Sequence, residues 1–212
     1  MQLAKTTLLS SSLLVVAMLF LILSPTKADA AAWYESGDAG DSIATANMTA
    51  GTGNMHQIIG NITMVPDNVD MYCVSIPFLA GFSAHISCEL TTERDLWLFD
   101  SNGYGVSLND GCTANWTFIS GTFGSGDGQY YLAISCTDDE ALSSSGTIWD
   151  PASASGQRAP DGPGAADPLI GWSTFNLMAV DPYLITIEGG EFCDDAVAVE
   201  TRTWDAAKAM YR

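Results

Sequence analysis

Short runs of hydrophobic residues, most of them alternating with polar residues, fill the middle of this chain, and turn-forming residues separate them. The runs cover residues 55–63, 69–76, 81–90, 96–99, 106–108, 116–123, 129–135 and 183–188. They are rich in β-branched and aromatic side chains and are bounded by Gly, Pro, Asn or Asp, which is typical of β-strands. No convincing helical period occurs between them, so the pattern predicts an all-β sandwich or barrel of about eight or nine strands.

The pattern of residues 95–111 indicates that this stretch lies at the centre of the fold. Residues 96–99 are large and apolar, and Asp, Asn and Gly break the run at 100–105 before the alternation resumes. We predict a buried core strand, a tight turn and a returning strand. Residues 143–168 are instead rich in Ser, Gly, Pro and Ala without periodicity, and we expect them to form a long excursion outside the core.

Both ends of the chain differ from the middle. Residues 1–30 resemble a secretory signal peptide, with an almost uncharged apolar stretch, a break at Pro25 and an A-x-A-like cleavage site. The alternative is an uncleaved membrane anchor, for which the apolar stretch is slightly short. Residues 191–212 form a tail that could end in a short helix over 204–211. A frayed terminus and a docking peptide are the two interpretations of this tail.

The charge balance restricts the partners. The chain has 25 acidic residues against 7 Lys and Arg, a formal charge of −18, and loss of the leader would make it one unit more acidic. This charge disfavours nucleic acids and anionic membrane surfaces as partners, and it favours cations and extracellular solubility. We therefore expect a secreted or cell-surface protein that leaves the membrane after cleavage of the leader.

Export would permit disulfide bonds among the five cysteines. Cys73 and Cys88 lie in consecutive predicted strands, Cys112 follows an acidic turn and Cys136 ends a strand. We predict the pairs Cys73–Cys88 and Cys112–Cys136, with Cys193 free or intermolecular, although spacing alone does not fix connectivity. No C-x-x-C pair occurs, which disfavours a zinc or redox site.

The order of several motifs points to a known family. The segments are GDAGDS at 37–42, IIGNI at 58–62, NVDMYCVSI at 68–76, FSA at 82–84, DLWLFDSNGYGV at 95–106, ND at 109–110, GQYYLAIS at 128–135, PLIGW at 168–172 and YLITIEG at 183–189. In this order they resemble the bacterial pre-peptidase C-terminal (PPC) domain family of secreted and surface proteins. The resemblance implies a jelly-roll-like antiparallel β-sandwich over residues 31–190 without catalytic activity.

The same resemblance implies a calcium site, because some members of the family bind calcium between an acidic linker and an acidic strand edge. Carried over to this chain, the ligands are Glu35, Asp38 and Asp41 from the linker and Asp67 and Asp70 from the strand edge. Calcium takes about six to eight oxygen ligands, mostly carboxylates and carbonyls. Turn formation is the alternative role of these acids, since Asp, Asn and Gly are common in turns.

Two other motifs fail their chemical tests. Residues 100–111 superficially resemble an EF-hand loop, yet the fifth position is Tyr104 and the twelfth is Gly111 in place of Glu. Residues 40–43 mimic the nucleophile block of secreted esterases, but polar residues precede them and no histidine lies near the C-terminus.

Aromatic residues offer a ligand-binding hypothesis, in which Trp97 and Tyr104 stack on sugars or apolar groups. In a strand, Trp97 points away from the face of Leu96 and Leu98 and shares a face with Phe99. If that face is a second surface of the sandwich, Trp97 lies in a groove. Core packing is the alternative, since large aromatic residues dominate cores.

Two functions remain. The first is a non-catalytic surface or adhesion-type module, stabilised by calcium, that binds an extracellular polymer or a surface protein. The second is a carbohydrate-binding module that acts on polysaccharide together with separate secreted hydrolases. An enzyme is disfavoured, because the sequence has no G-x-S-x-G, H-E-x-x-H or phosphate-binding glycine loop.

Overall fold

The computed structural model describes residues 31–62, 68–87, 94–111, 116–137, 139–153, 156–173 and 181–195. These residues are all-β, with two 3₁₀ turns, η1 (Leu79–Gly81) and η2 (Gly121–Phe123). In these ranges no helix is long and apolar enough to cross a bilayer. The predicted leader at 1–30 and the predicted helix at 204–211 lie outside the described residues.

Eight strands in the described part have five or more residues. They are β4 (Asn54–Ile62), β5 (Val69–Ile76), β6 (Ser83–Ser87), β7 (Arg94–Asp100), β8 (Gly105–Asp110), β9 (Trp116–Ser120), β10 (Gly128–Cys136) and β15 (Asp181–Phe192). Each of them coincides with one of the alternating runs in the sequence, so the all-β prediction is confirmed.

Shorter strands fill the connections between these eight. They are β1 (Ala31–Tyr34), β2 (Asn47–Met48), β3 (Ala50–Gly51), β11 (Glu140–Ser143), β12 (Gly146–Thr147), β13 (Gly156–Arg158), β14 (Gly171–Ser173) and β16 (Asp194–Asp195). With two to four residues each, they are too short to show a hydrophobic period.

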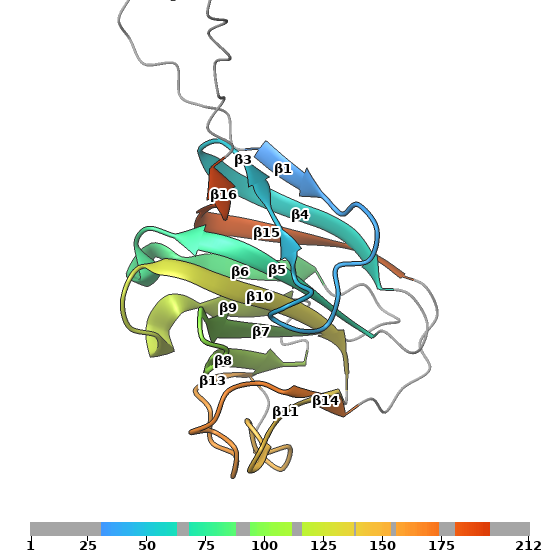
Figure 1. Cartoon of the computed structure of the whole chain (residues 1–212), viewed down its shortest axis with the longest axis vertical. Helices are drawn as coiled ribbons and strands as arrows, with labels where there is room; N and C mark the ends of the chain where they lie inside the picture. The colour runs from blue at the N-terminus through green and yellow to red at the C-terminus, as the bar shows by residue number, and fades with distance from the viewer. Residues whose placement is uncertain are drawn as a thin grey trace, which may run out of the picture.

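Most strands belong to one open sheet of 11 strands, with the order β1-β4-β15-β5-β10-β7-β8-β13 (Figure 1). The pairing is mainly antiparallel, and short parallel pairs join β1 to β4 and β2 to β5. The sheet branches at β15, because its Ile185–Glu188 stretch also pairs with β6, which in turn pairs with β9. A register shift between Thr186 and Gly190 then lets Glu191 and Phe192 pair with β5.

The central strands β5, β7 and β10 are buried on both faces. On one face Val74, Leu98 and Leu132 pack in a cluster with residues of β4, β6, β9 and β15. On the opposite face, side chains of the same strands such as Trp97 and Phe99 form a second cluster. Burial on both faces explains why the 96–99 run is continuously apolar, as in strands of covered sheets.

The segment 139–173 covers this second face, which corrects the prediction that residues 143–168 stay outside the core. Ile148 and Trp149 are fully buried in the second cluster. Strands β12, β11 and β14 form a separate three-stranded sheet in this segment. The covering residues pack through a few large side chains, so the segment lacks the alternation that marks a strand.

The hairpin between β7 and β8 confirms the predicted turn. The Asp100 carboxylate accepts the backbone N–H groups of Asn102 and Tyr104 at 2.8 and 2.9 Å. Gly103 has a φ of 86°, a conformation that glycine adopts without steric cost. The acids of this stretch therefore stabilise a turn.

The disulfide pairing differs from both predicted pairs. Cys73 on β5 is bonded to Cys193 directly after β15, so Cys73 does not pair with Cys88. Cys136 is a free, buried thiol, which also corrects the Cys112–Cys136 pair. Cys88 and Cys112 lie outside the described residues. The alternating pattern could not reveal that the end of β15 returns to lie beside β5.

Candidate metal centre

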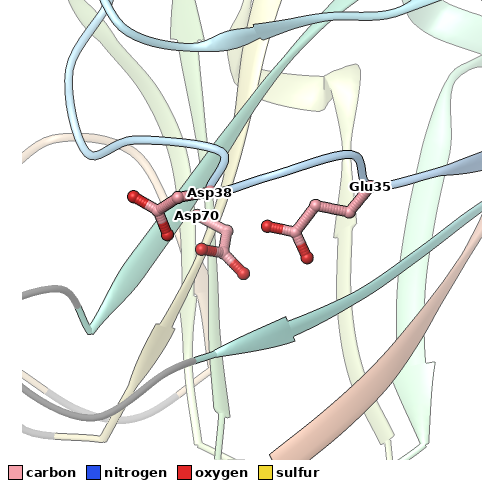
Figure 2. Close-up of side chains that lie close together, drawn as sticks. All are labelled: Glu35, Asp38 and Asp70. Atoms are coloured by element: carbon pink, nitrogen blue, oxygen red, sulfur yellow. The ribbon is translucent and has the colours of Figure 1, made fainter.

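Three carboxylates from two separate segments of the chain lie close together near the start of β5. Glu35 follows β1, Asp38 lies in the next loop and Asp70 lies on β5; one oxygen of each is within 4.8 Å of the others. Figure 2 shows the Glu35 side chain extending towards those of Asp38 and Asp70. Oxygens bound on opposite sides of one calcium ion are about 5 Å apart, so this group could hold a metal ion.

Backbone donors hold the Glu35 carboxylate in place. Its Oε2 accepts the N–H of Asn61 at 2.8 Å, and its Oε1 accepts the N–H of Ala39 at 3.1 Å. The backbone N–H of Glu35 donates to the Ile59 carbonyl at 2.9 Å, which continues the pairing of β1 with β4. The side chain is thus oriented by both β4 and the acidic loop.

Asp70 is oriented by two buried tyrosines. It is 1% exposed, and the Tyr183 hydroxyl of β15 donates to its Oδ2 at 2.6 Å. The Tyr72 hydroxyl of β5 is hydrogen-bonded to that of Tyr183. Burial raises the pKa of both phenols far above the usual range, so they remain protonated donors. Neither tyrosine was predicted, since only the fold brings them together.

Gly60 on β4 provides the space for this arrangement. A Cβ atom there would lie 2.5 Å from both the Glu35 Oε2 and the Tyr183 hydroxyl oxygen. Both distances are much shorter than a van der Waals contact. A Cβ atom at this position would therefore force the Glu35 carboxylate and the Tyr183 hydroxyl to shift.

The electrostatics of the group favour a cation. Burial raises the pKa of Glu35, and the charge of Asp38 adds to this, while the N–H donors of Asn61 and Ala39 oppose it. A bound cation would favour the ionised form and offset the repulsion among the three acids. Oxygen ligands without His or Cys suit calcium, magnesium or manganese.

The other predicted metal ligands are placed differently. Asp41 is exposed and lies outside the group, and its backbone carbonyl accepts the Trp172 indole N–H at 2.6 Å. Asp67 lies outside the described residues. In the same loop, the Ser42 hydroxyl is hydrogen-bonded to Thr45 at 2.7 Å, within a turn.

The two predicted ligand-binding aromatic residues differ in exposure to solvent. Trp97 is 1% exposed, and its indole N–H donates to Ser135 at 2.8 Å. Trp149 and Trp172 pack edge-on against it, with ring centroids 5.3 and 5.2 Å away. Trp97 therefore presents no exposed ring, and the core-packing alternative holds. Tyr104 is exposed on the hairpin turn, and its binding role stays a prediction.

Comparison with known proteins adds no relative. No model of a known protein family matches the chain, and no curated protein matches it.

Proposed function

We propose that this chain is an extracellular, non-catalytic binding module of the PPC type, stabilised by calcium held between Glu35, Asp38 and Asp70. The observation that carries the proposal is the meeting of these three carboxylates, which come from two separate segments of the chain. A cation there would fix the acidic loop to β5. Calcium suits the site best, because it tolerates the irregular geometry of a loop whereas magnesium requires a near-ideal octahedron.

Other features agree with this proposal. The Cys73–Cys193 disulfide is typical of an oxidising environment, which supports a secreted or cell-surface location. The branch at β15 brings β6 and β9 over the same core cluster as β5, β7 and β10. That arrangement supports the jelly-roll-like sandwich that the resemblance to PPC domains implies.

Thermal unfolding with calcium or chelator tests the proposal. At free calcium of 100 times its Kd, binding adds about 3 kcal/mol of stability, which corresponds to a rise in Tm of roughly 5–10 °C. Asp38→Asn should remove most of this rise. Asp41→Asn is the matched control, because Asp41 lies in the same loop and outside the group. An identical Tm for the wild-type chain with calcium and with chelator would refute the calcium centre.

A further inference from the structure

Ten outward-facing residues of five adjacent strands form a surface without charged side chains. This neutral face consists of Ala32, Tyr34, Gln57, Ile59, Asn61, His85, Phe118, Pro182, Leu184 and Thr186. They alternate with buried residues such as Ile58, Tyr183 and Ile185, which point into the core. Successive side chains of a strand point to opposite faces, so the ten residues share the outer side of β1, β4, β15, β6 and β9.

The strand register makes this face continuous. Tyr34, Ile59 and Leu184 lie side by side in one row across β1, β4 and β15. A second row joins Gln57, Thr186, His85 and Phe118 across β4, β15, β6 and β9. Directly opposed residues of paired strands have Cβ atoms about 5 Å apart. The two rows therefore form one surface, and β1, β4 and β15 can be followed side by side in Figure 1.

The lack of charge is unusual for this chain. Its formal charge is −18, carried by 25 acidic residues, and none of these acids lies among the ten residues of the face. Glu188, on β15 beyond Thr186, marks one end of the neutral face. The Glu35 carboxylate of the acidic group lies on the inner side of β4, because its Oε2 occupies the place to which a Cβ of Gly60 would point.

The side chains of the face suit a neutral polymer of hydroxyl groups. Tyr34 is 67% exposed, Leu184 43% and Phe118 42%, so aromatic rings are available to stack on the apolar face of a sugar. Gln57 and Asn61 carry amides, which donate to and accept from hydroxyl groups. Polyanions are repelled by the net charge, and polycations would be attracted to the acids elsewhere. Two copies of the chain would repel each other for the same reason.

We propose that the neutral face binds a neutral extracellular polysaccharide. This inference rests on the proposed function as a binding module and names its ligand class. It also moves the carbohydrate-binding role from buried Trp97 to exposed Tyr34 and Phe118.

Binding of the full chain to insoluble polysaccharides tests this proposal, with cellulose, chitin, xylan and β-1,3-glucan as neutral probes and alginate as an anionic one. We expect retention on at least one neutral polymer and none on alginate. The double variant Tyr34→Ala/Phe118→Ala should lower the affinity by about tenfold or more, as removal of aromatic anchors does at other interfaces. Phe78→Ala is the matched control, because Phe78 is 65% exposed and lies beside η1 outside the face.

Several outcomes would overturn the proposal. They are no retention on any neutral polymer, equal retention of the double variant and the wild-type chain, or a dimer in sedimentation that the double variant abolishes. Circular dichroism confirms that each variant is folded. The calcium melt separates the two proposals: a chain stabilised by calcium that binds no polysaccharide refutes the ligand alone. Polysaccharide binding without a calcium effect refutes the metal centre alone.

Discussion

Gly60 shows how a single residue determines the candidate metal centre. Its α-carbon lies beneath the Glu35 carboxylate and the Tyr183 hydroxyl, and no side chain fits between them. The Glu35 carboxylate is one of the proposed ligands, and the Tyr183 hydroxyl orients another by donating to Asp70. A methyl group at position 60 would displace both.

We therefore expect Gly60→Ala to weaken calcium binding and to lower the free energy of unfolding by about 1–3 kcal/mol, the usual cost of overpacking. Isothermal titration calorimetry measures the calcium affinity, and urea denaturation measures the stability. Gly171→Ala is the control, because a Cβ atom there meets nothing within 4 Å. Equal calcium affinities of Gly60→Ala and the wild-type chain would show that the close approach is unimportant.

Asp95 on β7 is a second residue of interest, because its buried surroundings determine how its carboxyl group affects the stability of the fold. Burial raises its pKa well above the ordinary 3.8, and the charge of Asp110 adds to this, while the Gly111 N–H opposes it. The folded state therefore binds this proton more tightly than the unfolded state does. The resulting stability is complete below pH 3.8 and is lost as the pH rises through the folded-state pKa.

We expect Asp95→Asn to stabilise the metal-free protein at pH 7 by more than about 1 kcal/mol, since it removes a buried charge. Its amide oxygen can still accept the Gly111 N–H, which donates to Asp95 at 2.9 Å. Urea denaturation at pH 7 and pH 4 should show the gain shrinking in acid. Exposed Asp41→Asn should show neither effect. A variant less stable than the wild-type chain at pH 7 would contradict the argument.

The resemblance to PPC domains predicted part of the metal centre. Glu35, Asp38 and Asp70 were expected from the resemblance, and the fold brings these three together. Asp41 was expected too, but the loop leaves its side chain outside the group. Tyr72 and Tyr183 are 111 residues apart, and only the pairing of β5 and β15 with their neighbours places them beside Asp70.

Among the elements, long strands were predictable and short ones were not. Strands such as β5 and β10 are long enough for alternation and β-propensity to identify them. Strands such as β2 and β16 have two residues each, and only their pairing with β5 and β3 defines them as strands. The continuous apolar run in β7 predicted a buried strand, whereas the covering segment 139–173 carries no comparable pattern.

The end of β15 is attached to β5 by the Cys73–Cys193 bond, which closes a loop with a sequence separation of 120 residues. We expect Cys193→Ser to lower the free energy of unfolding by about 3–5 kcal/mol, because a cross-link across a long loop restricts the unfolded chain strongly. Guanidinium denaturation measures the loss.

Reduction of the wild-type chain is the matched control, since it opens the bond without changing a side chain's identity, and it should give a similar loss. Non-reducing peptide mapping should find the Cys73–Cys193 peptide and an unpaired Cys136. A Cys73–Cys88 peptide would contradict the observed pairing.

At the scale of the whole molecule, Trp172 links the acidic loop to the covering segment. Its indole N–H donates to the Asp41 carbonyl at 2.6 Å, and its ring packs against Trp97 and Phe99, with centroids 5.2 and 6.0 Å away. The loop is therefore held by Trp172 at one end and contributes Glu35 and Asp38 to the metal centre at the other.

We expect Trp172→Phe, which keeps an aromatic ring and loses the N–H, to weaken calcium binding by about two- to tenfold, the equivalent of one hydrogen bond. The reason is that calcium must then order a less restricted loop. Ile170→Ala, at an exposed position of the same segment, is the control for calorimetric titration. Equal calcium affinities for Trp172→Phe and the control would show that the two regions are independent.

The position of Cys193 also sets an order of events during biosynthesis. Every strand of the described fold except β16 precedes this cysteine in the chain. Its partner on β5 is made 120 residues earlier, and chains emerge from their N-terminal end. Cys73 must therefore remain a free thiol, or form only temporary disulfides, until β15 has been synthesised. The bond can form only after nearly the whole domain has been made, so its presence marks a chain whose last long strand has reached its place.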